Sequence, residues 1–206
     1  MLTDLLMRKI LNILSARHRS GHAASTLETN ALDAAIWSVA MLVDDRVAFE
    51  SQAADVAEKL GAGAIDMLLS RLHTPTQPTP KTFESDTRGL GAWLAAWQFA
   101  IFEVLYHFRG SVLDALRGIA WGEYDWTQGN ALEILVRLAA KGIGRELTIA
   151  DFHRNFEHVS EEAKRYAVGP LLHRAKFDPE VAATVSELNS VREWREVVHE
   201  LESSKR

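Results

Sequence analysis

Helix-capping residues recur along this chain of 206 residues at spacings that suit pairs of helices. Asp44, Asp86, Asp125 and Ser160 each precede an apolar or alanine-rich stretch, and they lie 42, 39 and 35 residues apart. Asp and Ser side chains accept hydrogen bonds from the free N–H groups at a helix start. The spacing therefore predicts a series of helix pairs, because two helices and their turns take roughly 34–47 residues in repeat proteins.

A turn signal follows three of these caps at the same distance. Gly61, Gly142 and Phe177 each lie 17 residues after a cap, and Phe177 directly precedes Asp178 and Pro179. Glycine commonly ends a helix, whereas an Asp-Pro pair commonly begins one. Each cap therefore predicts one helix, and each turn predicts the start of a second.

Strand patterns are nearly absent from the chain. There is no sustained alternation of apolar and polar residues and no Asn-Gly or Asp-Gly hairpin turn. The sequence therefore predicts an all-α fold. The expected helices span about 2–18, 26–41, 44–60, 62–72, 86–108, 111–121, 126–141, 146–157, 160–175, 178–189 and 190–203.

Three stretches resemble HEAT-like and armadillo-like helical repeats. They are DDRVAFESQAADVAEKLGAGAIDMLLSRL, NALEILVRLAAKGIGREL and, more loosely, SEEAKRYAVGPLLHRAKFDPEVAATVSEL. The resemblance implies an irregular α-solenoid of about four to five stacked antiparallel helix pairs, in which neighbouring pairs bury a continuous core. A compact irregular helical bundle is the alternative, because the expected helix at 86–108 is long and the periods are unequal.

The pattern divides the chain into an N-terminal helix and a repeat domain. Residues 1–25 hold a basic amphipathic stretch, which we expect to be a helix that caps the repeats. A mitochondrial presequence or a helix on a membrane surface would look similar. The HEAT-like repeat domain is expected over 26–206. Three of the five prolines lie within 73–81, which predicts an exposed Pro-rich loop at 73–85.

Composition argues against several classes of function. The chain has no cysteine, so disulfides, thiolate metal sites and cysteine nucleophiles are excluded. The net charge of −5 argues against a nucleic-acid binder, which needs clustered Lys and Arg. No apolar run approaches the ~20 residues of a transmembrane helix. A cytoplasmic location fits these features, because thiol-free chains need no oxidising compartment.

Enzyme signatures are also missing from the sequence. There is no His-Glu-x-x-His motif, no Walker phosphate loop and no Gly-x-Ser-x-Gly nucleophile elbow. A single Glu-x-x-His occurs at Glu196 and His199, but a di-metal helix bundle needs two such motifs. We therefore predict no catalytic residues, no metal site and no cofactor.

The stretch WGEYDW, from Trp121 to Trp126, is the strongest candidate for a functional surface. It places two tryptophans, a tyrosine and two carboxylates between two expected helices. We expect Asp125 to cap the second helix and the two tryptophans to pack the corner. That leaves Glu123 and Tyr124 free to meet a partner, and Tyr is enriched at binding hot spots.

Two further pairs of residues extend the predicted partner surface. Glu133 and Arg137 lie one turn apart on helix 126–141, opposite a stripe of leucines. With Lys141 they form either a solvated ladder of charges or part of a concave binding face. Trp93 and Trp97 also lie one turn apart, and they either fill a junction in the core or contribute an aromatic surface.

These features favour a non-enzymatic module that binds another protein, and the acidic balance favours a basic partner. An immunity-type protein that neutralises a toxin domain is one form of this hypothesis. The alternative is an enzyme that resembles the HEAT-like DNA glycosylases of alkylation repair. Trp93, Trp97, Asp125 and Arg137 are the residue types that such a resemblance would place in a cleft. The net charge of −5 disfavours that alternative, because such an enzyme needs a basic groove.

Overall fold

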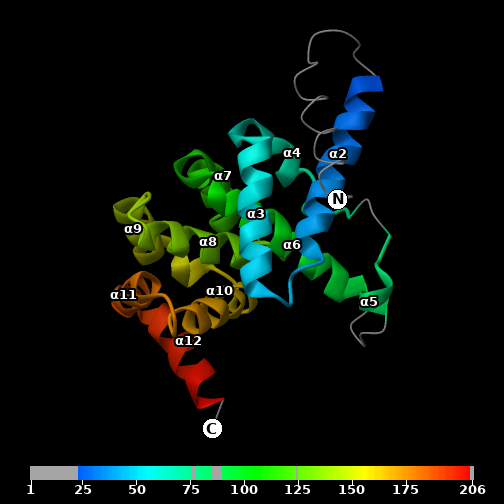
Figure 1. The fold of residues 1–206 in the computed structure, drawn as a ribbon. Coiled ribbons are helices and arrows are strands. Elements are labelled where there is room, and N and C mark those ends of the chain that lie inside the picture. Colours follow the sequence, from blue (N-terminus) through cyan, green and yellow to red (C-terminus); the bar gives the residue numbers. More distant parts are fainter. Residues whose placement is uncertain (1–22, 76–77, 85–89, 124, 205–206) are drawn as a thin grey trace. The chain divides into compact units, whose positions relative to one another are not determined.

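A computed structural model describes residues 23–75, 78–84, 90–123 and 125–204 (Figure 1). These residues form eleven α-helices and contain no strand, so the all-α prediction is confirmed for them. The chain divides into two compact units, residues 1–107 and 108–206. The helix predicted within residues 1–25 lies almost entirely outside the described residues.

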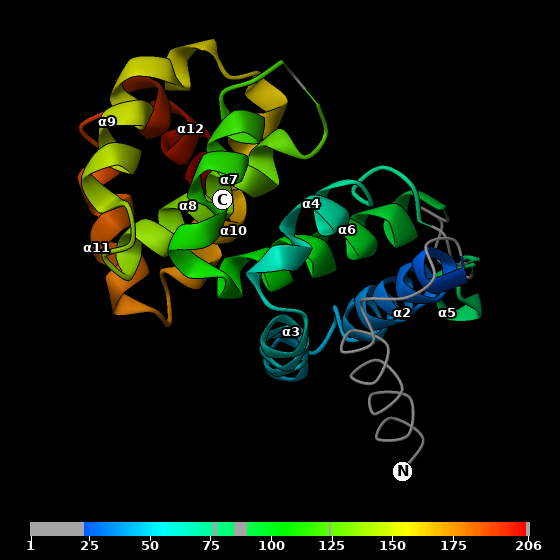
Figure 2. The same cartoon turned by 90° about the horizontal axis from the view of Figure 1, so that it is seen from above.

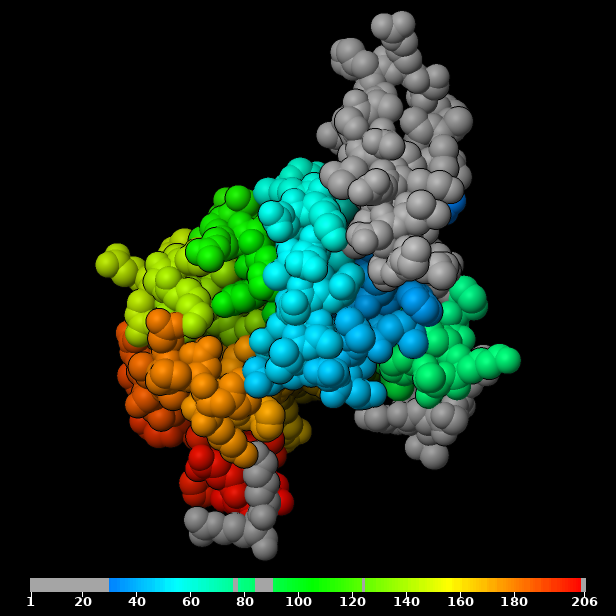
Figure 3. Space-filling view, in the orientation of Figure 1, coloured from blue at the N-terminus to red at the C-terminus, as the bar shows by residue number. Residues whose placement is uncertain are grey.

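Unit 1 is built around its last helix. Its helices are α2 (Ala23–Ala40), α3 (Arg46–Leu60), α4 (Ile65–Leu69), α5 (Lys81–Glu84) and α6 (Leu90–His107). α6 packs against each of the other four (Figure 2). Most of α6 is apolar around its whole circumference, as is typical of a helix in the centre of a core. α3 lies at the surface of this unit, as the light-blue and cyan atoms in Figure 3 show.

Polar contacts fix the segment after α4 within unit 1. Trp97 Nε1 donates to the Arg71 carbonyl at 2.9 Å, and Gln98 Nε2 donates to the Leu72 carbonyl at 3.1 Å. Arg71 Nε donates to the buried Asp33 carboxylate at 2.9 Å. Because these partners come from α2 and α6, the segment has one well-defined position in the core.

The predicted Pro-rich loop at 73–85 contains a helical turn. α5 occupies residues 81–84, where we expected loop, and that part of the prediction is wrong. Phe83 is half-buried, and its ring lies 5.1 Å from the ring of Trp93. Burial of this aromatic pair stabilises the turn against α6.

Unit 2 is built around a helix near its start. Its helices are α7 (Leu113–Ala120), α8 (Gln128–Ala140), α9 (Arg145–Asn155), α10 (Glu161–Arg174), α11 (Pro179–Leu188) and α12 (Arg192–Ser203). α8 packs against α7, α9, α10 and α11 (Figures 1 and 2). Leu132, Leu135 and Leu138 are buried as predicted, but so are Val136 and Arg137 on the opposite side. The interpretation of Glu133 and Arg137 as part of a solvated ladder of charges is therefore wrong for Arg137.

The helix contacts of unit 2 agree only in part with stacked pairs. α10 packs on both α8 and α12, as equivalent helices of successive pairs would. α8 also contacts α9 and α11, so its surroundings are those of a bundle core. The solenoid arrangement stays a prediction.

Two of the predicted helix caps, Ser160 and Asp178, are confirmed, whereas the predicted cap Asp86 lies outside the described residues. Ser160 Oγ accepts from the Ala163 N–H at 3.1 Å and caps α10. Asp178 caps α11 by accepting from the N–H groups of Glu180 and Val181, each at 3.1 Å, and Pro179 follows as expected. In α3 the cap is Asp45, one residue after the predicted Asp44.

Two glycine turns are confirmed by their backbone angles. Gly61 has φ 68° and Gly142 has φ 77°, values that L side chains rarely adopt. Gly61 donates its N–H to the Ala57 carbonyl at 2.9 Å and so ends α3. These glycines let the chain reverse direction tightly between consecutive helices.

Gly129 allows α8 and α10 to approach closely. A Cβ atom added at this position would lie 2.6 Å from Tyr166 Cβ and 2.8 Å from the Ala163 carbonyl oxygen. Real Cβ atoms essentially never come that close to another atom. The two helices therefore meet at a position where only glycine avoids a clash.

We predict that Gly129→Ala destabilises the protein by about 1–3 kcal/mol, because the added methyl group forces α10 away from α8. Gly118→Ala is the matched control. Gly118 lies within α7, and a Cβ there meets nothing within 4 Å. That change should stabilise the protein by up to about 1 kcal/mol, since alanine favours helices more than glycine does. Urea unfolding midpoints measure both changes, and equal effects of the two would contradict the close packing.

The Asp178 cap predicts a pH dependence of stability. Burial alone would raise the pKa of Asp178, but hydrogen bonds from the Val181 and Glu180 N–H groups and the charges of Lys141 and Arg174 outweigh it and lower the pKa. A carboxyl with a lowered pKa stabilises the fold above its unfolded pKa of about 4, and the contribution is lost as the pH falls through the folded pKa.

Asp178→Asn keeps a good capping residue but removes the charge. We expect wild type to be more stable than this variant by roughly 0.3–1 kcal/mol at pH 6, the usual effect of a charge at a helix N-terminus. The difference should vanish as the pH falls well below 4. Urea unfolding from pH 6 to pH 2.5 measures it, and a difference that stays constant would exclude this role for the charge.

Candidate functional site

A cluster of aromatic rings holds the corner between α7 and α8. Trp121 packs edge-on against Phe152, with ring centroids 5.2 Å apart. Phe152 in turn contacts Phe156 at 5.2 Å and Trp194 at 5.6 Å. Phe152, Phe156 and Trp194 are fully buried. The prediction that Trp121 packs the corner is therefore confirmed.

Asp125 shapes the last part of this corner, although it does not cap the helix. α8 begins at Gln128, and its cap position is occupied by Thr127. Asp125 Oδ1 accepts from the Thr127 backbone N–H and, at 2.7 Å, from the Thr127 hydroxyl. The expected cap is thus replaced by a turn that Asp125 closes just before the helix.

Trp126 is exposed, contrary to our expectation that it packs the corner. Its side chain is 66% exposed, the largest exposure of any tryptophan in the described part of the chain. Glu123 is also exposed, as predicted. Tyr124, the other predicted contact residue, lies outside the described residues. The corner therefore presents a tryptophan and a carboxylate to solvent.

A second exposed aromatic side chain lies beside the start of α8. Tyr166 on α10 is 50% exposed, and its Cβ lies against Gly129, three residues after Trp126. A shallow depression on this side of α10 is lined by Glu161, Glu162, Arg165, Tyr166 and Pro170. We call Glu123, Trp126 and Tyr166, together with this depression, the aromatic surface.

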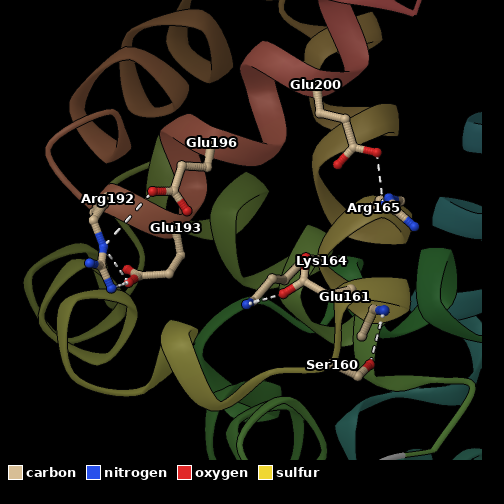
Figure 4. Close-up of polar contacts among 9 residues, drawn as sticks. Ser160, Glu161, Lys164, Arg165, Arg192, Glu193, Glu196 and Glu200 are labelled. Atoms are coloured by element: carbon tan, nitrogen blue, oxygen red, sulfur yellow. Dashed lines mark hydrogen bonds and ion pairs between the residues drawn. The ribbon is translucent and has the colours of Figure 1, made fainter.

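Lys164 and Arg165 of α10 both form ion pairs (Figure 4). Arg165 pairs with Glu200 of α12 at 2.8 Å. Lys164 is buried, pairs with Glu161 at 2.7 Å and lies 5.7 Å from the centre of the Phe156 ring. These contacts join α10 to both α12 and the aromatic cluster.

Glu133 and Arg137 do not form part of a binding face, contrary to our prediction. Arg137 is 4% exposed and Glu133 is 15% exposed. Arg137 Nη1 lies 3.5 Å from Glu133 Oε1, and Arg174 Nε of α10 lies 4.0 Å from the same oxygen. Because α10 and α11 cover this side of α8, the charges bridge helices within the core.

We predict that Glu133→Ala destabilises the protein by about 1–3 kcal/mol, because it leaves the buried Arg137 with one charge partner fewer. Glu180→Ala is the control, since Glu180 is 56% exposed and pairs with the half-exposed Lys141. That surface change should cost less than about 1 kcal/mol. Denaturant midpoints of the two variants test the ranking, and the reverse order would mean that Glu133 is solvated after all.

Trp93 and Trp97 are also unavailable to a partner. Both side chains are fully buried in the core of unit 1, where their rings lie 5.9 Å apart. The structure therefore agrees with the interpretation that this pair packs in the core. The prediction that the two tryptophans contact a partner is wrong. Periodicity could not decide between the two, because α6 is apolar on every side.

Among the described residues, no cluster of three or more His, Asp or Glu side chains could hold a metal ion. Ser190 Oγ lies 3.1 Å from His153 Nε2, but its hydroxyl donates to the Glu187 carbonyl at 2.8 Å. A serine has one hydroxyl hydrogen, so in this arrangement the histidine donates to the serine and does not activate it.

The buried carboxylate of Asp151 in unit 2 also has a structural role. Arg117 Nε donates to Asp151 Oδ2 at 2.7 Å, and Arg154 Nη2 donates to Asp151 Oδ1 at 3.1 Å. The hydrogen bond from Arg117 to Asp151 raises the pKa of that arginine. The contact ties α7 to α9 and so supports the corner that follows α7.

Comparison with models of protein families, with curated proteins and with solved structures finds no match for this chain. None of the helices in the described residues is long and apolar enough to cross a membrane.

Proposed function

We propose that the protein is a non-enzymatic module that binds another protein through the aromatic surface of unit 2. The observation that carries this proposal is the 66% exposure of Trp126, which lies in a turn where Asp125 accepts hydrogen bonds from Thr127. Tryptophan is the residue most enriched at the centres of protein interfaces. Burying it against a partner removes a large apolar side chain from water.

The support beneath Trp126 favours binding over a tolerated surface residue. Asp125 closes the turn that contains it, and Trp121 packs in the aromatic cluster. A side chain on a rigid support loses little conformational freedom when it docks, so more of the contact energy appears as affinity. Tyr166 on α10 adds a second aromatic contact.

We propose a basic partner, because carboxylates lie close to the aromatic surface. Glu123 is exposed three residues before Trp126, and Glu161 and Glu162 line the depression on α10. Such charges speed association with a basic protein and weaken in effect as salt is added. A toxin domain neutralised by an immunity-type protein would fit this description, and a cytoplasmic location belongs to the same proposal.

A helical-repeat arrangement supports this function. We propose that α8, α10 and α12 form one layer of a HEAT-like stack, because α10 packs on both of the others, and such stacks commonly serve as binding scaffolds. The DNA glycosylase alternative gains no support from the site. Trp93 and Trp97 are buried in unit 1, and Arg137 is buried in unit 2.

We predict that Trp126→Ala weakens partner binding at least about tenfold, or 1.4 kcal/mol, while the unfolding midpoint stays unchanged. Leu147→Ala is the matched control. Leu147 is a 41% exposed apolar residue on α9 of the same unit and outside the aromatic surface. Calorimetric titration against a partner isolated by affinity capture compares both variants with wild type.

Two results would contradict the proposal. Equal affinities of wild type and Trp126→Ala would show that the partner binds elsewhere. A change in self-association of the free protein on Trp126→Ala, measured by sedimentation, would show that Trp126 is covered by a second copy of the chain.

A further inference from the structure

An apolar strip runs along one side of α2 in unit 1. Ala34, Trp37 and Met41 follow one another at helical spacing, and the Met41 N–H still donates to the Trp37 carbonyl, so the three lie on one face. Trp37 is 38% exposed, and Ala34 and Met41 are half-buried. α2 packs on α6 and α3 through other residues, such as Ile36 and Ser38. The strip is therefore left partly open to solvent.

A pocket of about 330 Å³ continues this strip, because Met41 belongs to both. α6 contributes three alanines to its lining, and such small side chains leave room for another group. Phe99 of α6 also lines the pocket and is 40% exposed. The described residues that line it are Met41, Val43, Asp44, Thr82, Phe83, Ala92, Ala95, Ala96 and Phe99. We call the strip and this pocket the α2 groove.

A segment of this chain outside the described residues has the complementary pattern. Leu2, Leu6, Ile10 and Ile13 are spaced so that they share one face of the helix predicted over 2–18. Residues 1–22 contain four Lys and Arg against one Asp, whereas the whole chain has a net charge of −5. The segment and the rest of the chain therefore attract each other electrostatically.

The length of this segment fits the groove. Only residues 19–22, which include a glycine, separate the predicted helix from the start of α2 at Ala23. Connections this short join antiparallel helices. At 1.5 Å per residue, a helix over 2–18 is about 25 Å long and α2 is about 27 Å long. Pairing outward from the turn brings Leu6 beside Ala34 and Trp37, and Leu2 within about one helical turn of Met41.

We propose that residues 2–18 cover the α2 groove as an amphipathic helix antiparallel to α2. Leu6 and Ile10 pack on the strip, and Leu2 reaches the pocket. Docking removes these side chains and Trp37 from water, which stabilises the pair. The segment then belongs to the fold of unit 1, and its leucines do not serve as a presequence or as a helix on a membrane surface. The α2 groove shares no residue with the aromatic surface of unit 2.

A spin label tests this docking in the whole chain. Because the chain has no cysteine, Val47→Cys provides a single attachment site. Val47 is 69% exposed, and three residues of chain place it at most about 11 Å from Asp44 at the groove. In ¹⁵N NMR spectra, we expect the label to abolish the amide signals of residues 2–6 and to leave those of residues 14–18, which lie towards the far end of α2.

Two results would overturn the proposal. Signals of residues 2–6 that survive, or that are lost no more than those of residues 14–18, would show that the segment does not lie on the groove. A mixture of spin-labelled ¹⁴N protein with label-free ¹⁵N protein tests the source of the segment. Loss of the signals of residues 2–6 in that mixture would assign the groove to a second copy of the chain.

Two variants with the same change in charge provide the matched comparison. Residues 6 and 15 lie on opposite faces of a helix, because nine residues turn it by two and a half turns. Leu6→Asp places a charge against the groove and should restore the signals of residues 2–5. Ser15→Asp places the same charge in solvent and should leave those signals abolished. Equal spectra of the two labelled variants would overturn the proposal.

Discussion

The close contact between α8 and α10 is the constraint on which unit 2 depends. Gly129 brings the two backbones together at a distance that no side chain would permit. α8 is then covered by α7, α9, α10 and α11, so nearly all of its residues are buried. Because α8 is enclosed in this way, the corner between α7 and α8 ends at a fixed position.

The corner before α8 leads directly into this enclosed helix. Trp121 turns inward to Phe152 and the aromatic cluster, whereas Trp126 is 66% exposed and has no ring contact among the described residues. Asp125 closes the turn around Trp126 by accepting from Thr127. The outcome is an exposed tryptophan in a turn that two hydrogen bonds close. Tryptophan is enriched at interface hot spots.

Local signals in the sequence were enough to place most helices, because capping is a short-range interaction. Ser160, Asp178, Gly61 and Gly142 act as their residue types predict. The functional surface depended on long-range packing instead. WGEYDW contains two tryptophans that no local signal distinguishes, and only the position of Phe152 shows that Trp121 is the one that packs inward. Likewise, the spacing of Glu133 and Arg137 indicates a second face of α8 but not that other helices cover it.

Hydrogen exchange of the free and partner-bound protein tests the central claim most directly, because it reports which surface the partner covers. If the aromatic surface is the binding site, backbone amides in residues 121–128 and 162–170 exchange more slowly in the complex, while those around Leu147 on α9 are unaffected. Protection confined to other helices, with residues 121–128 unchanged, would contradict the account and assign the exposure of Trp126 to another cause.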